Sequence, residues 1–73
     1  IMDVATIFAR HLQDGYTEAY LWQQLFAAAY AEEPTSDLSD IGCQFFMALK
    51  RDQRVSPKAI ETDVETAIHA ALS

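Results

Sequence analysis

Apolar residues recur every three or four positions along most of the chain, the spacing that places side chains on one face of an α-helix. Alternation of apolar and polar residues, which is typical of strands, is nearly absent, and the chain has only two glycines and two prolines. Four segments carry the helical spacing, at about 3–13, 18–32, 37–52 and 57–73. The pattern predicts an all-α fold, a compact small four-helix bundle that forms one domain over residues 1–73.

Short local signals mark the ends of the first three helices. Gly15 follows the first helix as a left-handed stop, and Thr17 is the expected N-cap of the second. Pro34 disfavours helical geometry at the residue before it, so the second helix should end just ahead of this proline. Ser36 and Asp37 are the expected caps of the third helix.

The start of the fourth helix carries the clearest set of signals. Ser56 is placed to act as its N-cap and Pro57 as its first helical residue. Val55 is then expected to pack on Ile60 as a hydrophobic staple. Because Thr62 also begins a sequence that fits a capping box, a break near Thr62 is the alternative to the unbroken helix that we expect.

The second helix is apolar over an unusually wide arc. At 100° per residue, its apolar residues cover roughly 200°, which is wider than the stripe of an ordinary surface helix. These residues are Leu21, Trp22, Leu25, Phe26, Ala28, Ala29 and Tyr30. We therefore expect this helix to lie at the centre of the bundle and to be covered on more than one side. In the third helix, Gly42 predicts a close helix crossing, with Ala28 and Ala29 as its expected neighbours.

Aromatic residues on the second helix are the main functional lead. Tyrosine and tryptophan are enriched where proteins meet, and a single core in so short a chain has a thin margin of stability. One interpretation is that these residues only complete the core of the monomer. The other, which we favour, is a non-enzymatic protein-protein interaction module that forms a homodimer through this helix. Its expected partner-binding residues are Tyr20, Trp22, Phe26 and Tyr30, with Phe46 and Met47 as a second rim.

The charge balance suggests the alternative function. Eleven acidic residues against five basic ones give a net charge of −6 and a pI near 4.5, which disfavours nucleic acid and anionic lipid as ligands. An acidic inhibitor, such as an immunity protein, an antitoxin or a nucleic-acid mimic, would block a basic nuclease or DNA-binding partner. Four of the five basic residues fall in 50–58, where Arg54 and Lys58 are expected to pair with the acidic body or with an acidic partner.

Sequence motifs for catalysis, metals or cofactors are not found. His11, His69 and the single cysteine, Cys43, lack the spacing of a metal site, and Cys43 is expected to be a small half-buried apolar residue. In length and acidity the chain is similar to acyl carrier proteins. It departs from them because neither Ser36 nor Ser39 follows the aspartate that their attachment motif requires. We expect no enzyme activity and no cofactor.

The same features predict a cytoplasmic protein. One cysteine cannot form an internal disulfide, which favours a reducing compartment. The longest unbroken apolar run, 25–31, is far shorter than the ~20 residues that span a bilayer, and no basic start precedes an apolar leader. We therefore expect no contact with a membrane.

Overall fold

The computed structural model describes residues 3–33, 37–52 and 57–72. The chain forms four α-helices: α1 (Val4–Gln13), α2 (Glu18–Tyr30), α3 (Asp40–Asp52) and α4 (Pro57–Leu72). No strand occurs in these three ranges. The prediction of an all-α fold with four helices in a small bundle is confirmed.

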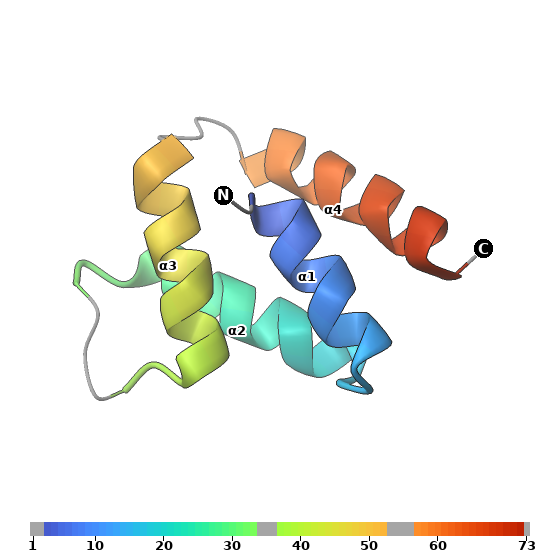
Figure 1. Ribbon diagram of the computed structural model, residues 1–73. Helices are drawn as coiled ribbons and strands as arrows, with labels where there is room; N and C mark the ends of the chain where they lie inside the picture. The colour runs from blue at the N-terminus through green and yellow to red at the C-terminus, as the bar shows by residue number, and fades with distance from the viewer. Residues whose placement is uncertain (1–2, 34–36, 53–56, 73) are drawn as a thin grey trace.

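The four helices form two pairs, and α1, a member of one pair, also contacts the other pair. α2 packs along α3, and α1 packs along α4, so that α1 lies between α4 and α2 (Figure 1). α1 also contacts α3. Among the four described helices, the backbone of α4 comes close only to α1. The two pairs are therefore held together mainly by α1, and the space between α2 and α4 is left to side chains.

The core draws on every helix. Phe8 of α1 is fully buried at its centre, with its ring centroid 6.2 Å from that of Phe45 and 5.0 Å from that of Trp22. No polar or charged residue is buried in the described part of the chain, so apolar packing alone fills the interior. The buried side chains are Val4, Ile7, Phe8, Leu21, Leu25, Ala28, Ile41, Phe45, Phe46, Ala48, Val64 and Ile68.

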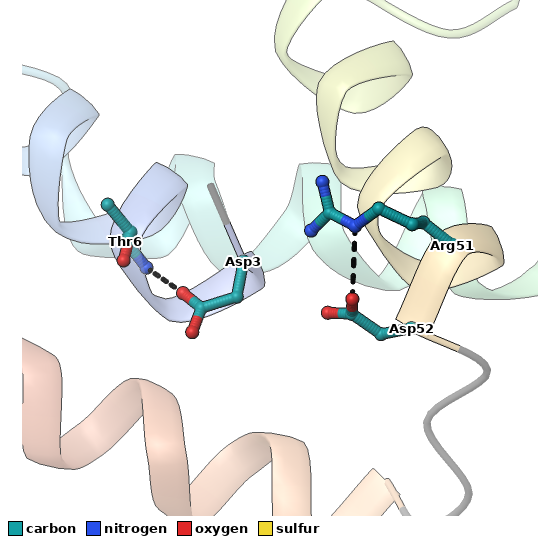
Figure 2. Close-up of polar contacts among 4 residues, drawn as sticks. All are labelled: Asp3, Thr6, Arg51 and Asp52. Carbon is teal, nitrogen blue, oxygen red and sulfur yellow. Dashed lines mark hydrogen bonds and ion pairs between the residues drawn. The ribbon is translucent and has the colours of Figure 1, made fainter. Parts of the chain in front are cut away.

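Two of the predicted end signals form as expected. Gly15 has φ of +107°, a conformation that side-chain-bearing residues rarely adopt, directly after the C-cap of α1. The hydroxyl of Thr17 accepts a hydrogen bond from the backbone N–H of Tyr20 at 3.1 Å and caps α2. At the start of α1, Asp3 Oδ1 accepts from the N–H of Thr6 at 2.8 Å (Figure 2). The conformation of Gly15 and the cap at Thr17 fix the short turn that leads from α1 into α2, and the bond to Asp3 caps the other end of α1.

The connection from α2 to α3 differs from the prediction at both ends. α2 ends at Tyr30, because Ala31 already has extended geometry. α3 begins at Asp40, and its cap is Ser39, whose hydroxyl accepts from the N–H of Gly42 at 3.0 Å. The predicted cap Asp37 lies in a turn before the helix, and Ser36 lies outside the described residues. The Ser39 hydroxyl also donates to Gln24 Oε1, so contact with α2 selects the capping serine.

Gly42 of α3 faces α2, and a side chain at this position would make contacts of ordinary length. A Cβ atom at this position would lie 3.5 Å from Gln24 Oε1 and 3.4 Å from Ser39 Oγ. The third near atom is Leu38 Cβ at 3.5 Å, so the nearest atom of α2 belongs to Gln24 rather than to Ala28 or Ala29, the neighbours that we expected. The hydrogen bond between Ser39 and Gln24 lies beside Gly42.

α4 is one unbroken helix, as expected. At the position of the possible break, the hydroxyl of Thr62 donates to the carbonyl of Lys58 at 3.0 Å, which is a bond within a continuous helix. Pro57 is its first residue. The cap and the staple that we expect at Ser56 and Val55 lie outside the described residues. None of the described helices combines the length and the apolar character of a membrane span.

Candidate interaction surface

The six residues predicted to bind a partner divide between the core and the surface. Phe46 is only 5% exposed and belongs to the core, so it is not available to a partner. Tyr20 and Trp22 are half-buried and pack against the core. Phe26 is 53% exposed, Tyr30 86% and Met47 62%. The exposed part of the predicted site is therefore carried by α2, with Met47 separate on α3.

α2 has two apolar faces on opposite sides of the helix. Its core face is formed by Leu21, Leu25 and Ala28. At 100° per residue, the positions pointing away from these three carry the outer face of α2, and all of its members are exposed: Ala19, Gln23, Phe26, Ala27 and Tyr30. The wide apolar arc of the sequence is thus one covered face and one uncovered face. Ala19 and Gln23 were missed as surface candidates, although the spacing of four residues from Ala19 to Gln23 to Ala27 is visible in the sequence.

The outer face of α2 carries no charge. Glu18 is the helix's only charged residue, and every position from 19 to 31 is uncharged in a chain whose net charge is −6. Exposed helix faces of soluble proteins are normally lined with charged side chains. An uncharged, partly aromatic face is the pattern of a surface that a second protein covers.

Phe26 is held in place by a stack of rings that starts in the core. Trp22 lies against Phe8, and the Phe26 ring is stacked on Trp22 with a centroid distance of 5.8 Å and an interplanar angle of 25°. The indole Nε1 of Trp22 donates to Glu18 Oε1 at 3.3 Å, which further fixes the tryptophan. A partner that binds Phe26 therefore meets a side chain that is already ordered, which lowers the entropic cost of binding.

An apolar groove runs beside the outer face, between α2 and α4. It has a volume of about 90 Å³ and exists because α4 approaches α1 rather than α2. Leu49 of α3 closes one part of it, and Glu61 is its only charged lining residue. The lining residues are Trp22, Leu25, Phe26, Ala29, Leu49, Ile60 and Glu61. Trp22 and Phe26 thus serve both the groove and the edge of the outer face.

Met47 belongs to a different surface. It lines a shallow hollow of about 370 Å³ between α1 and α3, to which α2 contributes no residue. Cys43, a half-buried free thiol, lines the same hollow. Met47 is therefore a separate exposed apolar residue and not a second rim of the outer face of α2.

A second aromatic group, which the sequence did not indicate, lies at the start of α2. Tyr16 is 44% exposed and stacks on Tyr20, with ring centroids 5.7 Å apart. The His11 ring meets Tyr16 edge-on at 5.6 Å, and His11 Nε2 lies 3.1 Å from Gln44 Oε1 of α3. This group ties the turn between α1 and α2 to the body of the protein and leaves Tyr20 in a structural role.

Acidic side chains line one small hollow of the protein. This hollow of about 20 Å³ has room for about one water molecule and is lined by Asp3, Asp52 and Asp63 together with Val4, Ala5 and Ile60. Arg51 Nε binds Asp52 Oδ1 beside it at 3.1 Å (Figure 2). Within the described ranges, no three histidine, cysteine or acidic side chains are placed to hold a metal ion.

No protein-family model, curated protein or solved structure matches this chain. What the protein does is therefore inferred from its own residues. The feature that bears most on function is the outer face of α2, which is exposed, uncharged and partly aromatic.

Proposed function

We propose that the protein is a non-enzymatic interaction module that forms a homodimer through the outer face of α2. The observation that carries this proposal is a helix with two opposite apolar faces of which the fold covers only one. Burial of apolar surface is the main driving force of association, and Phe26 and Tyr30 supply it here.

Charge favours a second copy of the chain as the partner. Two molecules of net charge −6 repel each other wherever their acidic surfaces meet. The outer face of α2 is uncharged from 19 to 31, so two copies can bring these faces together without placing like charges in the contact. A basic partner would gain nothing from charge at this face.

The size of the face supports a weak dimer. Phe26 and Tyr30 are 53% and 86% exposed. With about 200 Å² of surface for each aromatic side chain, the two expose about 300 Å² per molecule. A standard interface buries about 800 Å² per partner. Ala19, Gln23 and Ala27 add to the aromatic area but keep the interface at the small end of the range, so we expect exchange between monomer and dimer.

Sedimentation of the wild type beside two matched variants tests the proposal. Tyr30→Glu places a charge in the outer face, and Met47→Glu places the same charge on α3, where the side chain is also exposed to solvent. At tens of micromolar, we expect the wild type and Met47→Glu to sediment with dimer mass. Tyr30→Glu should sediment as a monomer, and its helical circular dichroism should equal that of the wild type.

Two outcomes would contradict the dimer. A wild type that remains monomeric at these concentrations rules out self-association. A dimer that persists in Tyr30→Glu but is lost in Met47→Glu would move the interface to the hollow between α1 and α3.

The acidic inhibitor is the second candidate function, and one observation favours it. A hollow of about 440 Å³ at the C-terminal end of α2 is lined by Tyr30 together with Glu32, Glu33 and Asp37. An aromatic ring among carboxylates suits a cationic side chain of a basic partner. Binding of this kind should weaken as salt is raised, whereas contact through the outer face should not.

A further inference from the structure

We infer that the two α2 helices of the dimer run antiparallel and cross between Phe26 and Ala27. This inference rests on the proposed self-association and adds its geometry. Closed dimers of one chain are usually two-fold symmetric, so the two copies of α2 would meet as either a parallel or an antiparallel pair. The distribution of side-chain size and charge along α2 separates the two arrangements.

Large and small residues are unevenly distributed along the outer face. The N-terminal half carries Ala19 and Gln23, whereas the C-terminal half carries the largest exposed side chain, Tyr30. A parallel pair would set Tyr30 against Tyr30 and hold the helices apart at Ala19, leaving a gap where close packing is required. The antiparallel pair sets Phe26 against Ala27 and Tyr30 against Gln23, so each large side chain meets a smaller one.

Charge beyond the helix ends favours the same direction. α2 has no basic residue in its last turn, and Glu32 and Glu33 follow its C-terminus. A parallel pair would gather the two glutamates of both copies at one end, next to two helix C-termini that carry partial negative charge. The antiparallel pair sends the glutamates of the two copies to opposite ends, each pair near a helix N-terminus that carries partial positive charge and one carboxylate, Glu18, so that no end collects four glutamates.

The order of Phe26 makes the crossing point well defined. Its ring is stacked on Trp22, which is itself packed on Phe8 in the core. Ala27, one residue on, has no side chain beyond Cβ and allows the partner's ring to approach. A two-fold axis between residues 26 and 27 makes this contact twice, because the Phe26 ring of each copy then packs against Ala27 of the other.

Disulfide formation from single cysteines tests the direction. In a Cys43→Ser background, we compare Ala27→Cys and Ala19→Cys, with Ala70→Cys on α4 as an exposed control for chance collision. In the antiparallel dimer, the two copies of residue 27 lie beside the axis, within the ~7 Å between Cα atoms that a disulfide spans. The two copies of residue 19 lie about 22 Å apart along the helices. We expect oxidised dimer from Ala27→Cys at least tenfold faster than from Ala19→Cys or Ala70→Cys.

The outcomes separate the direction of the helices from the dimer itself. Faster linkage of Ala19→Cys than of Ala70→Cys, in a protein that sediments as a dimer, overturns the antiparallel arrangement and leaves the proposed function standing. A dimer in which all three cysteines link at the collision rate overturns both, because the outer face of α2 would then lie away from the interface. A wild type that sediments as a monomer contradicts the proposed dimer itself, and therefore also the direction of its helices.

A charge pair gives a second measurement that needs no cysteine. In the antiparallel dimer, residue 30 of one copy faces residue 23 of the other. Gln23→Lys and Tyr30→Glu should therefore each weaken the dimer alone, and the double variant, which pairs lysine with glutamate twice across the axis, should restore it. In a parallel dimer the double variant sets lysine against lysine and glutamate against glutamate, so a double variant that stays monomeric contradicts the antiparallel pairing.

Discussion

At the residue scale, Ser39 connects the start of α3 to α2 through one hydroxyl. The oxygen accepts from the N–H of Gly42 at 3.0 Å and donates to Gln24 Oε1. The first bond caps the helix, and the second is a tertiary contact between residues 15 positions apart. Both bonds depend on a hydroxyl at this position, because the same oxygen accepts one hydrogen bond and donates the other.

Ser39→Ala should lower the free energy of unfolding by about 0.5–2 kcal/mol through loss of the cap. Gln24→Ala keeps the cap and removes only the tertiary bond, so it should cost less, about 0.5–1.5 kcal/mol. Urea unfolding of both variants and of the double variant measures the two terms. Equal losses in the two single variants would show that the bond to Gln24, and not the cap, is what Ser39 contributes.

The caps show how far local sequence carries the prediction. Thr17 and Gly15 were predicted correctly because each is the only residue of its type at a boundary that periodicity already marks. The cap of α3 was not, because Ser36, Asp37 and Ser39 all qualify by residue type. The choice between them is made by Gln24, and a contact at that distance in sequence leaves no local signal.

At the scale of the helices, periodicity identified the wide apolar arc of α2 but not its division into two faces. Spacing fixes which residues share a face, whereas the neighbours that cover the face depend on how the helices pack. We expected α2 to be covered on more than one side, yet α4 turns to α1 and leaves Phe26 and Tyr30 outside. For the same reason Phe46 was taken for a rim residue, although α3 directs it into the core.

Because α4 packs against one helix alone, we expect it to be the first helix to unfold locally. From 58 to 72, the part of this helix whose side chains the structure describes, only Val64 and Ile68 are buried, whereas α3 buries five of its residues. Local opening needs the least free energy where the fewest apolar contacts are lost. In native-state hydrogen exchange, amides of α4 should therefore open at lower free energy than those in the middle of α2 and α3.

Val64→Ala sharpens this expectation. Loss of two buried methyl groups should reduce the free energy of α4 opening by about 2 kcal/mol. Glu65→Ala, at an exposed neighbouring position, should change it by less than about 0.5 kcal/mol. If the α4 amides of the wild type are as protected as those of α2, the protein opens as one unit. The smaller number of buried residues in α4 would then not lower its free energy of opening.

At the scale of the whole molecule, the acidic surface and the exposed apolar surface lie in different places. The net charge of −6 is carried outside 19–31, while the outer face of α2 is uncharged. Charge on the rest of the surface limits non-specific association, because any two copies repel at a distance. The uncharged face is then the place where repulsion is smallest and apolar gain is largest.

This separation predicts that salt strengthens the dimer. Two charges of −6 whose centres lie about 25 Å apart repel by about 3 kcal/mol at ~0.01 M ionic strength and by almost nothing at ~1 M. Contact through the outer face contains no ion pair for salt to weaken, so the dissociation constant should fall by about tenfold or more across this range. Sedimentation at a series of sodium chloride concentrations measures it, with Tyr30→Glu as the variant that should keep monomer mass at low salt. A dimer that loosens as salt is raised would mean that opposite charges, and not the outer face of α2, hold the two copies together.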